Sequence, residues 1–94
     1  MEGIRKIFGR NVQKYRQLRN WSQAELAKKI DISTAFMMHI EHGTRGASME
    51  TIELLARCFE IPYKALFEET AEAKTNYAQV LFALEDALKE RLNA

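Results

Sequence analysis

The chain has 94 residues, of which 47% are hydrophobic and 29% charged, and its net charge is +1. This length and composition fit one small globular domain with a modest core, and they exclude a disordered or low-complexity chain. A single cysteine cannot form an internal disulfide, the first residues lack the pattern of a secretory signal, and no apolar run reaches the ~18 residues of a membrane span. We therefore expect a cytoplasmic protein with no membrane contact.

Two helices are predicted in the first third of the chain. Apolar side chains recur at helical spacing from about 4 to 19, and basic side chains occupy most of the other positions. Ser22 and Glu25 then stand three residues apart as in a capping box, where each side chain accepts a hydrogen bond from the other's backbone amide. The second helix is therefore expected from about 23 to 30.

The segment from 23 to 42 has the pattern of two short helices joined by one tight corner. Ala27 lies where two steeply crossing helices come closest, because a larger side chain would hold them apart. Asp31 lies at the corner, where a residue that tolerates left-handed backbone is needed. The apolar positions share one face on each helix: Leu26, Ala27 and Ile30 on the first, Met37 and Ile40 on the second. This pattern indicates a helix-turn-helix, which presents its second helix to the major groove of DNA.

The remaining helices of the bundle follow from their capping residues. Ser33 or Thr34 begins the third helix, and Gly43 ends it with a left-handed residue. Ser48 caps a fourth helix that continues to Phe59, and acidic residues suit its N-terminal end.

A short fifth helix is expected over 63–67, with Pro62 in its first turn. No alternating apolar pattern or hairpin signal predicts a strand. The fold class is therefore all-α: a compact five-helix bundle with a helix-turn-helix in residues 1–69, followed by one C-terminal amphipathic helix in residues 70–94.

The C-terminal helix has a wide apolar face that the bundle does not need for its own core. This face either folds back onto the domain or packs against a second copy, and the second alternative is favoured because such modules usually bind DNA as two-fold dimers. The expected dimerisation residues are Tyr77, Val80, Leu81, Leu84 and Leu88.

Charge is distributed unevenly along the chain. Residues 1–49 contain nine basic and four acidic side chains and carry a net charge of +5, whereas residues 50–94 carry −4. One face would then meet a polyanion, although charge also fluctuates by chance along any short chain.

Three sequence runs resemble helix-turn-helix proteins of the phage-repressor or xenobiotic-response-element type, the Cro/C1 type. They are SQAELAKKI, IEHG and SMETIELLARCFEIPYKALF, and the resemblance extends over about residues 4–68. It implies a repressor-like DNA-binding domain and a transcriptional regulator, more often a repressor, that binds double-stranded operator DNA as a homodimer.

The resemblance also implies roles for individual side chains. Thr34, Ala35 and His39 match positions that contact bases, with Phe36 beside them. Arg16 and Glu41 match an internal ion pair between the first and third helices. The expected phosphate contacts are Gln23, Lys28, His42, Thr44 and Arg45, although Lys28 would equally suit a solvated helix face.

The chain also departs from the family pattern. Asp31 replaces the usual glycine of the turn, and Ala47 replaces a proline that is common before the fourth helix. The third helix contains no arginine, lysine, asparagine or glutamine, the side chains that make bidentate contacts to bases. Ala35 and Phe36 would instead contact thymine methyl groups, with further discrimination from DNA shape. Alternatively, Phe36, Met38 and the C-terminal helix bind a protein partner, as in an antitoxin or co-regulator.

Enzyme chemistry is not indicated. No glycine-rich phosphate loop is present, and no nucleophile has a matched base. His39, His42 and Cys58 would be conceivable metal ligands, but Cys58 belongs to an apolar helical face, where we expect it to be buried, and a fourth ligand is missing. The sequence therefore predicts neither a metal nor a cofactor.

Overall fold

The computed structural model describes residues 3–69. The elements are α1 (Ile4–Leu18), α2 (Gln23–Lys29), α3 (Thr34–His42), α4 (Met49–Phe59) and η1 (Tyr63–Phe67). The all-α fold class is confirmed, but the predicted fifth helix is a short 3-10 helix, so four α-helices make up this part of the chain. Pro62 precedes η1 in extended backbone and does not lie in its first turn. The predicted C-terminal helix and its five dimerisation residues lie outside the described residues.

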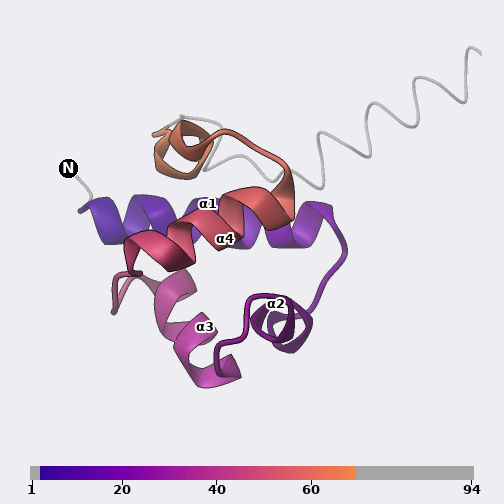
Figure 1. Cartoon of the computed structure of the whole chain (residues 1–94). Helices are drawn as coiled ribbons and strands as arrows, with labels where there is room; N and C mark the ends of the chain where they lie inside the picture. Colours follow the sequence, from indigo (N-terminus) through magenta and orange to yellow (C-terminus); the bar gives the residue numbers. More distant parts are fainter. Residues whose placement is uncertain (1–2, 70–94) are drawn as a thin grey trace, which may run out of the picture.

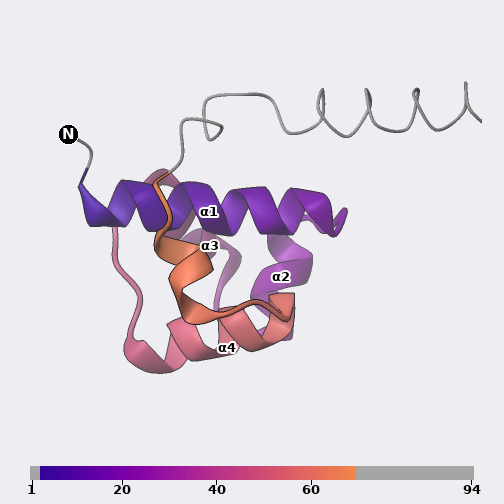
Figure 2. The same cartoon turned by 90° about the horizontal axis from the view of Figure 1, so that it is seen from above.

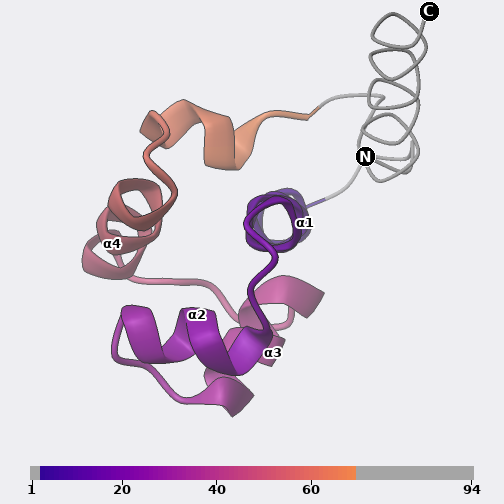
Figure 3. The same ribbon diagram turned by 90° about the vertical axis from the view of Figure 1, so that its right-hand side faces the viewer.

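Helix α1 lies between α3 and η1 and contacts both, and one side of it is not covered by any described element (Figure 3). Seen along α1, helices α2 and α3 lie on one side, η1 lies on the opposite side, and α4 lies to the left between them (Figure 3). Seen from above, η1 spans the gap between α1 and α4 (Figure 2). The helix-turn-helix is therefore held on one side of the bundle, away from η1.

The predicted apolar faces supply a single core. Phe59 lies at its centre and packs against the rings of Tyr15 and Trp21, with ring centroids 5.7 and 6.0 Å away. The ends of α1 project beyond the core, so Ile4 is 66% exposed and Leu18 39% exposed although both share its apolar face. The buried residues of this core are Phe8, Val12, Leu26, Ala27, Ile30, Met37, Ile40, Leu55, Ala56, Phe59 and Leu66.

Serine side chains and one left-handed glycine fix the helix ends, as the sequence predicts. The capping box at Ser22 is present, and of the two candidates at the start of α3 it is Ser33 that accepts the Phe36 amide. Ser48 caps α4 in the same way. Gly43 ends α3 with φ of 74°. Each cap satisfies backbone groups that a helix end leaves unpaired.

A close approach between α1 and α3 depends on Gly9. A Cβ atom at this position would lie 2.2 Å from the carbonyl oxygen of Ile40 and 2.8 Å from that of Glu41. The backbones of the two helices therefore touch where no side chain fits between them. Because the contact lies at the C-terminal half of α3, the N-terminal half extends away from α1 (Figure 1).

We predict that Gly9→Ala lowers the free energy of unfolding by about 2–3 kcal/mol, because α3 must move to admit the methyl group. Urea unfolding followed by circular dichroism measures the loss. Gly3→Ala is the matched control, since nothing lies within 4 Å of a Cβ at that position, and its cost should stay below about 1 kcal/mol. Equal stabilities for the two variants would contradict the close contact.

Candidate nucleic-acid interface

The corner between α2 and α3 has the backbone that a helix-turn-helix requires. Asp31 adopts φ of 59°, in the left-handed region. The amide of Ile32 then donates to the carbonyl oxygen of Ala27 over 2.9 Å, which closes the turn. Ala27 itself is only 1% exposed, so its methyl group lies inside the core. The short polar side chain of aspartate tolerates the left-handed backbone usually given to glycine.

One face of α3 is open to solvent along its whole length. Its residues follow one another at helical spacing, and they are Thr34, Ala35, Met38, His39 and His42. The opposite face, with Met37, Ile40 and Glu41, is buried. We call the first set the exposed face of α3.

Phe36 and Met38, the two residues of α3 that a protein partner would contact, differ in their exposure. Phe36 is half-buried and packs against the core, so only part of its ring faces outward. Met38 is 43% exposed and lies at the centre of the exposed face. The sequence predicts only partner binding for Met38, although its spacing of one turn from both Thr34 and His42 already places it on the same helix face as those residues.

The inner face of α3 is anchored by one carboxylate. The Glu41 carboxylate accepts three hydrogen bonds: from Nε of Arg16 over 2.6 Å, from Nη2 of Arg16 over 3.0 Å and from Nε2 of Gln23 over 3.0 Å. Arg16 also donates to the carbonyl oxygen of Trp21. The Glu41 side chain is 1% exposed and that of Arg16 12%. Glu41 therefore joins α3 to α1 and α2, and the only acidic residue of α3 points away from its exposed face.

Basic side chains border the loop that follows α3. Arg45 lies in this loop and is exposed. A Cβ at Gly46 would be 3.3 Å from Nε of Arg5, and one at Gly43 would be 2.9 Å from Cα of Lys6. The start of α1 thus lies against this loop, so Arg5 and Lys6 come near it, although sequence reasoning did not place them there.

His39 is tied to the same loop through Thr44. The ring nitrogen Nδ1 of His39 lies 2.9 Å from Oγ1 of Thr44. The Thr44 hydroxyl donates to the carbonyl oxygen of His39 over 3.2 Å, and the Thr44 amide donates to the same oxygen over 3.0 Å. One side of the imidazole is therefore occupied within the protein, and Nε2 is its remaining polar atom.

Metal chemistry finds no support in the described residues. Within residues 3–69 no three His, Cys, Asp or Glu side chains gather closely enough to hold a metal ion. Cys58 is half-buried, not fully buried as predicted. Burial raises the pKa of its thiol, and the nearby charges of Lys29 and Arg19 offset this in part. A protonated thiol is a poor nucleophile and a poor metal ligand.

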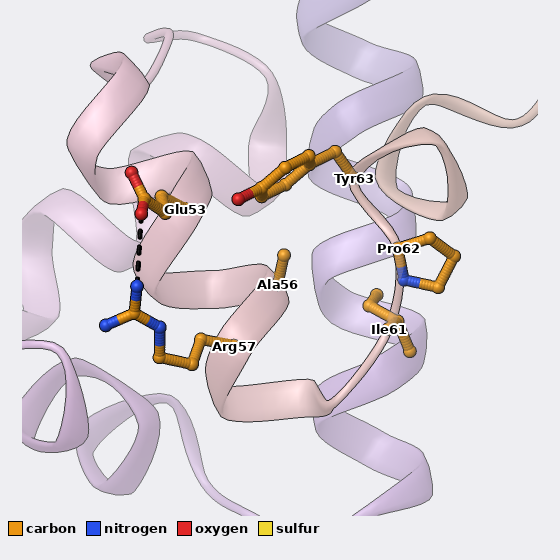
Figure 4. A pocket seen from close by; sticks show the side chains of 6 residues that line it. All are labelled: Glu53, Ala56, Arg57, Ile61, Pro62 and Tyr63. Carbon is orange, nitrogen blue, oxygen red and sulfur yellow. Dashed lines mark hydrogen bonds and ion pairs between the residues drawn. The ribbon is translucent and has the colours of Figure 1, made fainter.

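A hollow of about 400 Å³ lies between α4 and η1 (Figure 4). Its apolar lining comes from Ala56, Ile61 and Pro62, and Tyr63 forms one side. The two charged residues at its edge pair with each other, since Nη2 of Arg57 donates to Glu53 over 3.1 Å. None of these residues belongs to the exposed face of α3, so the hollow is separate from the candidate interface.

Comparisons with known proteins agree with this geometry. A family model described as Helix-turn-helix matches residues 12–66. Control protein C.BamHI of Bacillus amyloliquefaciens is 37% identical over 71 residues, which cover 71% of this chain and 84% of that protein. The crystal structure of the restriction-modification controller protein C.AhdI from Aeromonas hydrophila superposes with a TM-score of 0.63 at 27% identity, over 67% of this chain and 96% of that one.

A third comparison bears on the fold alone. The hypothetical transcription factor NHTF from Neisseria superposes with a TM-score of 0.69 at 21% identity, over 74% of this chain and 80% of that one. The fold, the exposed face of α3 and these matches define a DNA-binding transcription regulator and not an enzyme. The chain belongs to the helix-turn-helix family of the Cro/C1 type. In the part of the chain that the structure describes, no helix is long and apolar enough to cross a membrane.

We predict that Glu41→Gln lowers the free energy of unfolding by about 3–5 kcal/mol, because Arg16 is left buried without a counter-charge. Thermal unfolding measures the effect. Glu53→Gln makes the same substitution in the exposed ion pair with Arg57, whose side chains are 52% and 73% exposed, and should cost less than about 1 kcal/mol. A Glu41 variant as stable as the Glu53 variant would show that the buried pair does not hold α3 in place.

Proposed function

We propose that this regulator inserts α3 into the major groove of double-stranded DNA and recognises an operator sequence with the exposed face of that helix. The observation that carries this proposal is the exposure of Thr34, Ala35 and His39 on a helix whose N-terminal half extends away from α1. An α-helix with its side chains is about 10–12 Å across, which fits a groove about 12 Å wide.

The chemistry of this face favours apolar contact. Ala35 and Met38 offer a methyl group and a thioether, which pack against thymine methyl groups. Thr34 and His39 supply its polar groups near the start and middle of the helix. Bidentate pairs to guanine or adenine are absent, so sequence-dependent DNA shape would provide part of the discrimination.

Phosphate contacts would come from the two ends of the helix-turn-helix. Lys28 is exposed on α2, His42 is exposed at the end of α3, and Arg45 is exposed in the loop that follows α3. Gln23 gives one amide hydrogen to Glu41 and keeps a second for a phosphate oxygen. Arg5 lies against the same loop as Arg45 and would add charge there.

We further propose that the protein acts as a homodimer, that it is a repressor and that it works in the cytoplasm. A single recognition helix contacts only a few base pairs, and a two-fold pair of helices doubles the length of the site. The expected interface is the apolar face of the C-terminal helix: Tyr77, Val80, Leu81, Leu84 and Leu88. C.AhdI is named a restriction-modification controller protein and C.BamHI a control protein, and these names support control of a restriction-modification system as the biological setting.

We predict that Arg45→Ala weakens binding to all duplexes alike. The dependence of log K on log salt should also become shallower by about 0.9, the loss of one phosphate contact. Fluorescence anisotropy with a selected duplex and a random duplex at several salt concentrations measures both effects. Lys64→Ala is the control, because Lys64 is an exposed residue of η1 on the opposite side of α1 (Figure 3).

The same experiment separates the proposal from its alternative. If the wild-type protein binds no duplex even at low salt, α3 would instead contact a protein partner through Met38 and the outward part of the Phe36 ring. Binding to every duplex with equal affinity would leave a DNA-binding protein without sequence recognition and would contradict an operator.

We predict that the full chain sediments as a dimer, whereas a chain ending at Glu69 sediments as a monomer. The described core is complete by Leu66, so the shortened chain retains every buried apolar residue of the bundle. Sedimentation equilibrium gives the two masses. Equal numbers of subunits in both proteins would remove the C-terminal helix from dimerisation.

A further inference from the structure

We propose that Thr44 fixes the His39 ring in the tautomer protonated at Nδ1, so that Nε2 faces the DNA as a hydrogen-bond acceptor. His39 then selects a base with an amino group in the major groove, adenine or cytosine. The second half of this inference rests on the proposed base contact of α3. The first half concerns the free protein alone.

Counting protons gives the tautomer. The Thr44 hydroxyl has one hydrogen, and it is donated to the carbonyl oxygen of His39 over 3.2 Å. The contact of 2.9 Å between Thr44 Oγ1 and His39 Nδ1 then needs a hydrogen from the ring. Nδ1 must therefore be the protonated nitrogen. In the neutral imidazole the other nitrogen, Nε2, is left as an acceptor.

The opposite tautomer is poorer by one hydrogen bond. If Nδ1 were unprotonated, the hydroxyl would donate to it and have no hydrogen left for the carbonyl oxygen. The two oxygen atoms, Thr44 Oγ1 and the His39 carbonyl, would then face each other at 3.2 Å with no hydrogen between them. The tautomer with unprotonated Nδ1 therefore has one hydrogen bond fewer and adds repulsion between the lone pairs of the two oxygens.

The position of Thr44 is fixed by the backbone around it. Its amide donates to the His39 carbonyl oxygen over 3.0 Å. The preceding Gly43 has left-handed backbone and lies against Lys6 of α1. These backbone contacts keep Thr44 next to His39, so its hydroxyl lies within hydrogen-bond distance of the ring. Thr44 is thus a positioning residue for His39, and both of its hydrogen-bond donors are used within the protein.

The tautomer determines which base edge His39 can accept from. In the major groove adenine presents its N6 amino group and cytosine its N4 amino group, whereas guanine and thymine present carbonyl oxygens at the equivalent position. An unprotonated Nε2 accepts from the first pair and repels the second. The inference therefore assigns adenine or cytosine to the base that faces His39.

The tautomer is tested in the free protein by nitrogen NMR of the imidazole rings in a mildly alkaline buffer, with His42→Gln as background so that His39 is the only histidine. We expect Nδ1 to be protonated. Thr44→Val, which has the same shape without the hydroxyl, should shift the ring towards protonation at Nε2, and Thr44→Ser should restore the wild-type spectrum. Protonation at Nε2 in the protein with Thr44 would overturn the inference.

The base preference is tested by selecting duplexes from a random pool. The position that faces His39 is the one whose preference disappears in His39→Ala, and wild-type protein should enrich adenine or cytosine there. Thr44→Val should lose about tenfold of this discrimination, measured as the ratio of affinities for duplexes that differ only at that position, and Thr44→Ser should leave the ratio unchanged. Guanine or thymine at that position, or an unchanged preference in Thr44→Val, would overturn the inference. Absence of any selected sequence would instead refute the proposed operator recognition.

Discussion

The Glu41 carboxylate is the point on which the orientation of α3 depends. Its two oxygens accept three hydrogen bonds, two from Arg16 of α1 and one from Gln23 of α2. Burying these charges is costly, and the cost is offset only when the geometry is good and the remaining donors are satisfied. Arg16 meets that condition, since its third nitrogen donates to the Trp21 carbonyl oxygen. The pair thus links α3 to both α1 and α2 inside the domain.

The packing face of α3 and the face proposed to contact DNA lie on opposite sides of the helix. With 3.6 residues per turn, Met37, Ile40 and Glu41 point inward, and the positions between them point outward. Gly9 strengthens the separation, since it lets the α1 backbone contact the carbonyl groups of Ile40 and Glu41 directly. The helix is therefore held close to the scaffold by its C-terminal half. Its outward side chains make few contacts with the core, so they can change with little effect on folding.

The sequence predicts the helices and the orientation of α3 well, because these depend on local signals. Serine caps, the left-handed Gly43 and the apolar spacing each act within a few residues, and the structure places the helices accordingly. The missed features depend on distant segments. Gly9 matters only because α3 crosses there, 31 residues later in the chain than the glycine itself. The 3-10 form of η1, the exposure of Ile4 and the bond between His39 and Thr44 likewise follow from tertiary packing or loop geometry.

The sparse chemistry of the exposed face makes the orientation of each side chain more important. A helix with arginine or glutamine obtains about 1–3 kcal/mol of discrimination from each bidentate pair, and those long side chains adjust to small errors in docking. Alanine and histidine have no such reach, so their contacts depend on where α3 is held. The Glu41 anchor fixes the helix, and Thr44 fixes the ring of His39 upon it. In the proposed complex with DNA, a rigid scaffold would thereby supply part of the selectivity that longer polar side chains supply in other DNA-binding helices.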